Sequence, residues 1–387
     1  MLETENLPAT VPPTYLDCAA TTPVDPRVRD AVLRYLCEEF GNAGSRTHSY
    51  GSAARRAAEQ ARDQVAAAVG CSRSEVIFTS GATESDNLAI LGLATYGESV
   101  QRTHLVTTQI EHRAVLEPIQ ALCRRGMSVT AIPPEPDGRV DPGKVLAAVC
   151  PDTLLVSVMQ VNNETGIHQP VSEIAEGLSG AGAYFHVDAA QGFGHYWREL
   201  HHPRIDMISL SGHKVFAPKG IGALIARRRS GVRPPLEPLH FGGGQELGLR
   251  PGTLPVHLVV GLGLAAELAV RDAVQRAAAC LEYRAQLLAG LSPLNPELNG
   301  NSAHVAPAIA NLSFPGIDAE EAMEAVADLI AVSNGSACTA ASDACSHVLA
   351  AMGIGPDRAA AAIRFSWCHN TPEPDWREIV KRLRLLG

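Results

Sequence analysis

A lysine in one short segment is placed for covalent amine chemistry. Residues 211–214 (SGHK) directly follow the apolar run Met207–Leu210. A lysine at the end of a buried strand, flanked by hydroxyl and imidazole groups, is suited to form a Schiff base beside a phosphate anchor. The alternative interpretation of Lys214 is a surface lysine in a turn between strands.

A carboxylate ends the preceding apolar segment. Asp188 follows Tyr184–Val187, and Gln191 stands three residues further on. The carboxyl ends of parallel strands are where α/β proteins place ligands, and a carboxylate there can pair with a protonated pyridine nitrogen. Asp188 could equally cap the next helix. A metal site built from His186, Asp188 and His213 is a third interpretation.

Two further segments carry polar or nucleophilic groups. In residues 79–87 (TSGATESDN) a glycine turn leads from a strand into a helix, which is a natural phosphate site, although helix capping explains the same residues. Residues 333–341 (SNGSACTAA) surround Cys338 with small neighbours. Such neighbours favour an accessible loop in which a thiolate acts as nucleophile, whereas most free cysteines are buried and inert.

The elements that must position these groups form an α/β pattern. Between residues 49 and 228 short apolar runs alternate with helical segments, which predicts a mostly parallel sheet covered by helices. A long helical stretch, 256–291, leads into a smaller α+β region. We therefore expect a flexible tail over 1–13, a large domain over 14–265 and a small C-terminal domain over 266–387 that carries the cysteine loop.

Composition limits the class of function. The chain has 387 residues with 32 Lys and Arg against 41 Asp and Glu, so its net charge of −9 disfavours direct nucleic-acid binding. The longest apolar stretch, 256–270, is interrupted by His257 and Glu267 and is too short to span a bilayer. Nine cysteines, an odd number without a CxxC pair, argue against a disulfide framework. We expect a soluble cytoplasmic protein without a metal or membrane contact.

Taken together, the segments resemble the cysteine desulfurases of the NifS/IscS type, in the class V family of pyridoxal-phosphate enzymes. The matches run in family order from residue 16 to residue 366. They are LDCAATTPVDPRV from Leu16, FGNAGSRTH from Phe40, FTSGATESDNLAI from Phe78, EHRAVL from Glu111, VNNETG from Val161, HVDAAQ from His186, SGHKVFAPKGIGAL from Ser211, RPGTLPV from Arg250, SNGSACTA from Ser333 and IRFS from Ile363. The resemblance implies a large domain of the fold type I transferase kind.

The resemblance also implies the cofactor, pyridoxal 5′-phosphate, and how it is held. It makes Lys214 the point of covalent attachment, Asp188 the partner of the ring nitrogen, His112 the group stacked on the ring that assists proton transfer, and Gln191 the partner of the phenolic oxygen. The implied residues around the phosphate are Ala82, Thr83, Ser211 and His213, together with Thr253 from the partner subunit of a homodimer.

The implied reaction converts L-cysteine to L-alanine. Asn163 and Arg364 hold the substrate carboxylate, freed Lys214 removes the Cα proton, and Cys338 takes the sulfur as a persulfide for a protein acceptor. The segment SNGSACTA is similar to the group with a long catalytic loop. Cys345 and Cys368 receive no role.

The acceptor is left open by the sequence. The resemblance allows an acceptor that carries sulfur to iron–sulfur clusters, to tRNA thiolation or to DNA phosphorothioation. The stretch GGGQELGLRPGT differs from the GGGHERGMRSGT of many housekeeping members, notably at Gln245, Leu247 and Pro251, and similarity to the phosphorothioation subgroup is one interpretation. Alternative activities are a selenocysteine lyase or another class V aminotransferase. A non-catalytic scaffold of a sulfur-transfer complex is an alternative of another class.

Overall fold

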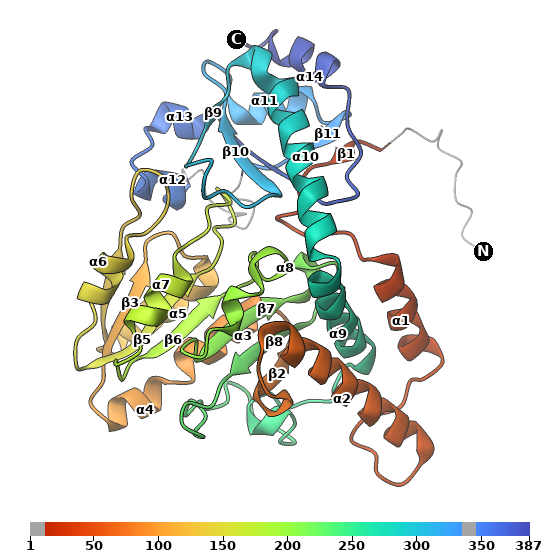
Figure 1. Ribbon diagram of the computed structural model, residues 1–387, viewed down its shortest axis with the longest axis vertical. Coiled ribbons are helices and arrows are strands. Elements are labelled where there is room, and N and C mark those ends of the chain that lie inside the picture. The colour runs from red at the N-terminus through yellow and green to blue at the C-terminus, as the bar shows by residue number, and fades with distance from the viewer. Residues whose placement is uncertain (1–11, 335–345) are drawn as a thin grey trace.

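A central sheet of seven strands organises the larger part of the computed structural model, which describes residues 12–334 and 346–387 (Figure 1). In spatial order the strands are β2 (Val76–Thr79), β8 (Gly222–Ala226), β7 (Met207–Ser211), β6 (Tyr184–Asp188), β5 (Thr153–Met159), β3 (His104–Thr108) and β4 (Ser128–Ile132). β8 is antiparallel to both its neighbours, and the other pairs in the sheet are parallel. The predicted mostly parallel sheet is confirmed.

Helices cover both faces of this sheet. They are α2 (Ser49–Val69), α3 (Ala82–Leu91), α4 (Ala94–Ser99), α5 (Arg113–Arg124), α6 (Pro142–Ala147), α7 (Val171–Gly177), α8 (Phe193–Tyr196) and α9 (Val256–Arg271), and α1 (Pro26–Cys37) packs against α9. Successive residues of a strand point to opposite faces. Leu155 joins the apolar cluster that contains residues of α3 and α5, and Val156 joins the cluster that contains residues of α2, α7 and α9. Since both faces are buried, the inner strands are rich in apolar residues, and the polar residues they contain, such as Ser157 and His186, are themselves buried.

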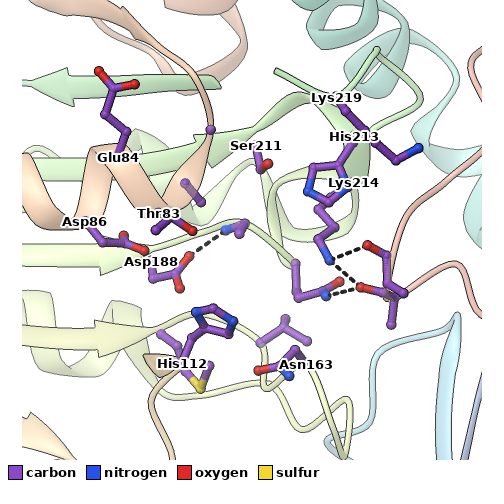
Figure 2. A pocket seen from close by; sticks show the side chains of 18 of the residues that line it. Thr83, Glu84, Asp86, His112, Asn163, Asp188, Ser211, His213, Lys214 and Lys219 are labelled. Atoms are coloured by element: carbon purple, nitrogen blue, oxygen red, sulfur yellow. Dashed lines mark hydrogen bonds between the residues drawn. The ribbon is translucent and has the colours of Figure 1, made fainter. Parts of the chain in front are cut away.

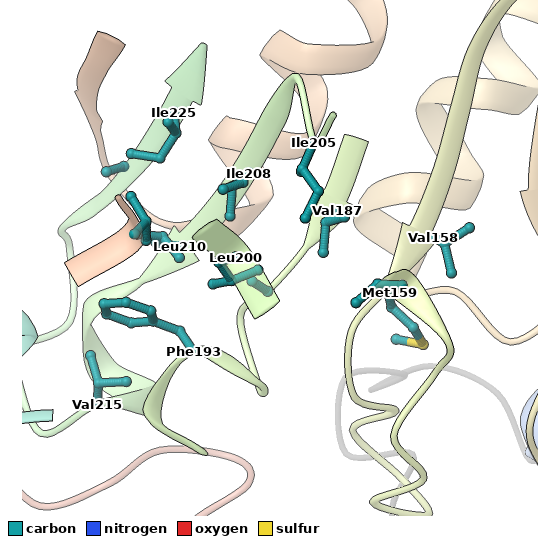
Figure 3. Packing of buried hydrophobic residues seen from close by; sticks show 14 of the residues in the cluster. Val158, Met159, Val187, Phe193, Leu200, Ile205, Ile208, Leu210, Val215 and Ile225 are labelled. Atoms are coloured by element: carbon teal, nitrogen blue, oxygen red, sulfur yellow. The ribbon is translucent and has the colours of Figure 1, made fainter. Parts of the chain in front are cut away.

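The second of these clusters also supports the loops that carry polar groups. Figure 3 shows Phe193 of α8 beside Leu210 of β7 and Val215, all in one buried cluster. Phe193 is 1% exposed and Leu210 is fully buried. Because protein interiors are close-packed, this contact fixes the turn that follows β7.

A smaller sheet lies at the other end of the molecule (Figure 1). Its antiparallel strands are β12 (Ala362–Ser366), β10 (Ile309–Ser313) and β9 (Glu297–Leu298), and β1 (Thr14–Tyr15) pairs in parallel with β11 (Ile330–Ala331). The remaining helices are α10 (Ala273–Leu291), α11 (Ala319–Ala325), α12 (His347–Ala351), α13 (Pro356–Ala360) and α14 (Trp376–Leu383). Leu16, near the start of the chain, packs in the apolar core of this part with residues of α10 and β12.

The helical stretch predicted over 256–291 is two helices. α9 ends before Asp272, which has φ −95° and ψ 4°, and α10 begins after it. The Asp272 carboxylate binds Arg27 at 2.9 Å and Arg276 at 3.6 Å. α9 packs on α1 and α2, whereas α10 continues to the small sheet (Figure 1). Over the described ranges, no helix has the length and apolar character needed to cross a membrane.

Candidate active site

A cavity of about 550 Å³ lies at the carboxyl ends of β6 and β7, where the large sheet meets the small-domain strand β12. It is lined by Ala19, Ala20, Ser80, Gly81, Ala82, Thr83, Glu84, Asp86, His112, Met159, Val161, Asn163, Asp188, Ala190, Gln191, Ser211, His213, Lys214, Lys219, Gly220 and Arg364. The polar members come from segments that are far apart in the sequence and converge at the strand ends, as expected for ligand sites in α/β proteins.

Lys214 ends the short helical turn that follows β7 and faces the cavity (Figure 2). Its Nζ donates hydrogen bonds to the carbonyl oxygens of Ala19 and, at 3.0 Å, Ala20. Gln191 Nε2 donates to the same Ala19 oxygen at 2.8 Å. The N-terminal segment therefore orients the amine of Lys214 and holds Gln191 beside it.

Asp188 is buried at the end of β6 and points into the same space as His112 (Figure 2). The backbone N–H of Ala190 donates to Asp188 Oδ1 at 2.9 Å. Burial raises the pKa of Asp188, and the charges of His112 and Lys214 act in the opposite direction. A carboxylate that is desolvated in this way gains stability from a cation placed within the cavity.

A second buried carboxyl group lies behind Asp188. Asp86, on α3, is 1% exposed, and its Oδ1 is 3.5 Å from His186 Nε2. His186 also contacts Ser157 at 2.8 Å and Ser209 at 2.9 Å. Burial raises the pKa of Asp86 and, next, so does the negative charge of Asp188. The two acids favour a state in which they do not both carry a charge.

His112 is fixed by the start of helix α5. It occupies the N-cap position, and its Nδ1 accepts a hydrogen bond from the Ala114 N–H at 3.1 Å. An Nδ1 that accepts requires the proton of a neutral imidazole to be on Nε2. The cap thus sets both the orientation of the ring and its tautomer.

The opposite end of the cavity is suited to an anion. The N-terminus of α3 presents Ala82 and Thr83, and Ser211 and His213 approach from β7 and its turn. Backbone N–H groups at a helix N-terminus bind phosphate. Among the described residues, His213 Nδ1 is buried without a hydrogen-bond partner, and burial, together with Lys214 and Lys219, lowers the pKa of His213 to about 4. An anion would supply the missing partner.

Arg364 of β12 brings a guanidinium group to the side nearest the small domain. It is 3% exposed, donates to the Asn163 carbonyl oxygen at 2.9 Å, and pairs with Asp17 Oδ1 at 2.8 Å. Its backbone exchanges hydrogen bonds with Ser333. A planar guanidinium at this position is suited to a carboxylate ligand, which would compete with Asp17.

The structure brings together every predicted site residue except Thr253 and Cys338. Thr253 is exposed and is not part of this cavity. Cys338 lies outside the described residues, but both neighbouring segments border the site. The backbone of Ser333 is hydrogen-bonded to the backbone of Arg364, and Ser346 Oγ donates a hydrogen bond to the Glu164 carboxylate.

Sequence reasoning missed three features of the site. Asp17 pairs with Arg364, the carbonyl groups of Ala19 and Ala20 bind Lys214, and Asp86 stands behind Asp188. The matching stretches from Leu16 and Phe78 contain these residues, although their patterns assign no contact. In residues 12–334 and 346–387 no three His, Cys, Asp or Glu side chains are grouped to hold a metal ion, and His186 is instead enclosed between two serines.

Comparisons with known proteins agree with this geometry. The family model "Aminotransferase class-V" matches residues 14–377. The curated protein "Cysteine desulfurase IscS" of Anaeromyxobacter dehalogenans is 46% identical over 377 residues, covering 97% of this chain and 92% of its own.

Solved structures are similar over almost the whole chain. A structure entitled "NIFS-LIKE PROTEIN" has a TM-score of 0.87 at 35% identity, covering 97% of this chain and 98% of its own. The crystal structure of DndA from Streptomyces lividans has a TM-score of 0.80 at 50% identity, with coverage of 92% and 99%. The structure "SspA in complex with cysteine" has a TM-score of 0.80 at 36% identity, with coverage of 91% and 98%.

Proposed function

The chain belongs to the class V aminotransferase family and is a pyridoxal-phosphate-dependent cysteine desulfurase, and from this premise we propose which of its residues carry the reaction. The observation that supports the assignment best is the position of Lys214, whose amine faces a cavity that also holds Asp188 and an anion-binding helix end. The substrate is L-cysteine and the products are L-alanine and a protein-bound persulfide.

The residues of the cavity fit the cofactor at three points. Lys214 would hold it covalently, the buried Asp188 would pair with its ring nitrogen, and His213 with the start of α3 would bind its phosphate. The lowered pKa of His213 would rise beside such a dianion, because the anion stabilises the charged imidazolium. When bound, the cofactor supplies an electron sink for the charge left at the substrate Cα.

We propose that Arg364 and Asn163 orient the substrate. Arg364 donates two parallel hydrogen bonds to the substrate carboxylate, and this requires it to exchange its contact with Asp17. With the carboxylate held at β12, Lys214 would take the proton from the substrate Cα, and His112, whose Nε2 carries the proton, would assist proton transfer in the cavity.

Cys338 is the proposed acceptor of sulfur. Its thiolate attacks the sulfur atom of the substrate and a new S–S bond forms. The C–S bond breaks, its electron pair stays with the substrate Cβ, and that carbon takes up a proton to give the methyl group of alanine. The support is positional, because Ser333 and Ser346, which flank residues 335–345, both bond to residues beside the cavity. The sulfur then passes to a protein acceptor. We infer an acceptor in iron–sulfur, tRNA-thiolation or phosphorothioation chemistry.

We propose a homodimer in which Thr253 completes the phosphate site of the partner. Thr253 is exposed in this chain, and so is the preceding loop, with Phe241 at 89% and Leu247 at 52% exposure. Exposed large apolar side chains of this kind are typical of surfaces that a second subunit covers. The cysteines of the described residues are all free thiols, which supports the proposed cytoplasmic location.

The deciding experiment compares the wild-type enzyme with Cys338→Ser. The variant should keep the visible absorption of bound cofactor and lose persulfide, measured by trapping the modified residue and identifying it by mass spectrometry. Desulfurase turnover should fall at least about 100-fold, because an activated nucleophile is removed from a covalent mechanism.

The matched control is Cys37→Ser, which removes an exposed thiol on α1. It should leave both persulfide and alanine formation unchanged. Persulfide on another cysteine in the Cys338→Ser enzyme would disprove the role of Cys338. Release of alanine from selenocysteine alone would instead identify a selenocysteine lyase.

A further inference from the structure

A second, smaller cavity adjoins the active site and is unusually rich in thiols. Its volume is about 50 Å³, and Ala19, Gln191 and Lys214 line both cavities. The other lining residues include Cys18, Cys280, Cys368, Arg276 and His369. The desulfurase mechanism proposed above uses none of these thiols.

Two of the thiols lie in this one cavity although their segments are distant in sequence. Cys18 and Cys368 both line it and are 6% and 7% exposed. The Cys18 N–H donates to the Ser366 carbonyl oxygen at 3.0 Å, so the backbone holds Cys18 beside the end of β12. The fold therefore places the two thiols in the same small cavity.

The two sulfur atoms differ in character. The neighbouring Cys18 thiol lowers the pKa of Cys368 to about 6, with help from Thr371 Oγ1 at 3.6 Å and from the charge of Arg276. Cys368 and burial in turn raise the pKa of Cys18 well above its usual range. Cys280, in the same cavity, has its pKa raised to about 12 by burial. One thiol is thus the nucleophile, and its neighbour keeps a proton.

We propose that Cys18 and Cys368 form a reversible disulfide when the enzyme meets a peroxide. The Cys368 thiolate attacks one peroxide oxygen, the O–O bond breaks, and with a proton taken up one water leaves, so that Cys368 becomes a sulfenic acid. Cys18 then attacks that sulfur, the S–S bond forms, and a second water leaves. Two electrons pass from the sulfur atoms to the peroxide, and a low-molecular-weight thiol reverses the process.

Oxidation of this pair would act on the catalytic lysine through one residue. Ala19 follows Cys18, and its carbonyl oxygen accepts hydrogen bonds from both Lys214 Nζ and Gln191 Nε2. The Ala19 N–H donates to Ser366 Oγ at 2.8 Å, which ties the same peptide to β12. Drawing the two sulfur atoms into bonding distance therefore shifts an acceptor of Lys214.

The test begins with disulfide mapping of the wild-type holoenzyme. Brief hydrogen peroxide treatment is followed by blocking of exposed thiols with N-ethylmaleimide, denaturation, alkylation of the remaining thiols with iodoacetamide and digestion. The expected product is a peptide pair joined through Cys18 and Cys368, with the loss of two alkylatable thiols, and dithiothreitol should restore both. This readout does not depend on catalysis, so it is separable from a failure of the proposed function.

The variants Cys18→Ser and Cys368→Ser should lack the linked peptides, whereas Cys280→Ser, from the same cavity, should keep them. Recovery of Cys18 and Cys368 as free thiols, linkage of Cys368 to Cys280, or oxidation of Cys368 to a sulfinic acid while Cys18 stays free would each overturn the proposal.

A second readout reports the link to Lys214. In a Cys338→Ser background, which removes the contribution of the catalytic thiol, peroxide should shift the visible absorption band of the bound cofactor, and dithiothreitol should reverse the shift. The same treatment of the Cys18→Ser, Cys338→Ser double variant should leave the band unchanged. An identical shift in both proteins would show that the pair does not act on Lys214.

Discussion

At the scale of single residues, Glu111 is a buried acid beside the site whose pKa is raised by burial. It is fully buried next to His112 in the chain, and its Oε1 accepts hydrogen bonds from Thr108 Oγ1 at 2.7 Å and the Met159 N–H at 2.9 Å. Within the described part of the chain, Oε2 has no partner. Burial raises the pKa of Glu111 from 4.5 to about 8, so at neutral pH it is a neutral acid.

This shift predicts a pH-dependent effect of Glu111→Gln. The folded-state pKa exceeds the unfolded value, so stability is fully present below pH 4.5 and is lost as the pH rises toward 8. Glutamine keeps an acceptor for both hydrogen bonds and cannot ionise. Relative to wild type, the variant should gain up to about 4 kcal/mol in unfolding free energy between pH 5 and pH 8, at about 1.4 kcal/mol per pKa unit. Urea unfolding at the two pH values measures this, and a pH-independent difference would contradict it.

Individual residues also show which contacts of the site can be predicted from the sequence and which cannot. Lys214, Asp188 and His112 have side chains whose chemistry points to their roles, and the cavity brings them together. Ala19 has no side-chain chemistry, because its carbonyl oxygen makes the contact with Lys214. Such a backbone contact depends on tertiary folding and leaves no residue-type signal.

At the scale of elements, strand β8 and helix α3 meet where no side chain fits. A Cβ added to Gly222 would lie 2.4 Å from the Leu210 carbonyl oxygen and 2.6 Å from the Gly81 Cα. Both neighbours are backbone atoms, and Gly81 precedes the helix end proposed to bind phosphate. Because Gly222 has no side chain, the backbone of β8 can pack directly against Gly81, which precedes α3.

Gly222→Ala should therefore disturb both the fold and the site. We expect a loss of about 1–3 kcal/mol in stability, typical of overpacking, and weaker cofactor binding. Thermal unfolding and titration with pyridoxal phosphate measure the two effects. Gly180→Ala is the matched control, because no atom lies within 4 Å of its added Cβ. Equal behaviour of the two variants would refute the packing argument.

Elements were predictable where one local signal dominates. The buried strand β8 is an unbroken apolar run, and α2 ends at Gly70, which has φ 65°. The division of 256–291 at Asp272 was not predicted, because the apolar pattern continues on both sides of it. The charge pairs with Arg27 and Arg276 that hold Asp272 are tertiary contacts.

At the scale of the whole molecule, the position of Thr253 predicts subunit complementation. Thr253→Ala and Lys214→Ala subunits should each be impaired as homodimers. In a mixed dimer, the Thr253→Ala subunit keeps Lys214 and receives Thr253 from its partner, so one site is intact. Coexpressed, tag-purified mixed dimers should regain about half the wild-type turnover and bind about one cofactor per dimer with wild-type affinity, since one of two sites is complete.

The control for complementation is a mixed dimer of Lys214→Ala with a Lys214→Ala, Thr253→Ala double variant, which has no intact site. If the first mixed dimer performs no better than the Thr253→Ala homodimer, Thr253 acts within its own subunit. The resemblance to the family leads us to expect a partner subunit. How two subunits are arranged depends on contacts between chains, which no local sequence pattern predicts.

The N-terminal segment connects the two sheets of the molecule with very little chain. On the side of the small sheet, the Leu16 N–H donates a hydrogen bond to the Ala331 carbonyl oxygen at 2.9 Å. On the other side, Lys214 Nζ donates a hydrogen bond to the Ala20 carbonyl oxygen at 3.0 Å. An extended chain spans at most about 3.6 Å per residue, so the four residue steps from Leu16 to Ala20 limit the separation of these two residues to about 14 Å. The small domain cannot swing away as a rigid lever while both ends hold. A wider opening would have to break contacts of this segment, which include those of Lys214 and of His213 with Thr22, and this couples access to the site with the hydrogen bonds around its lysine.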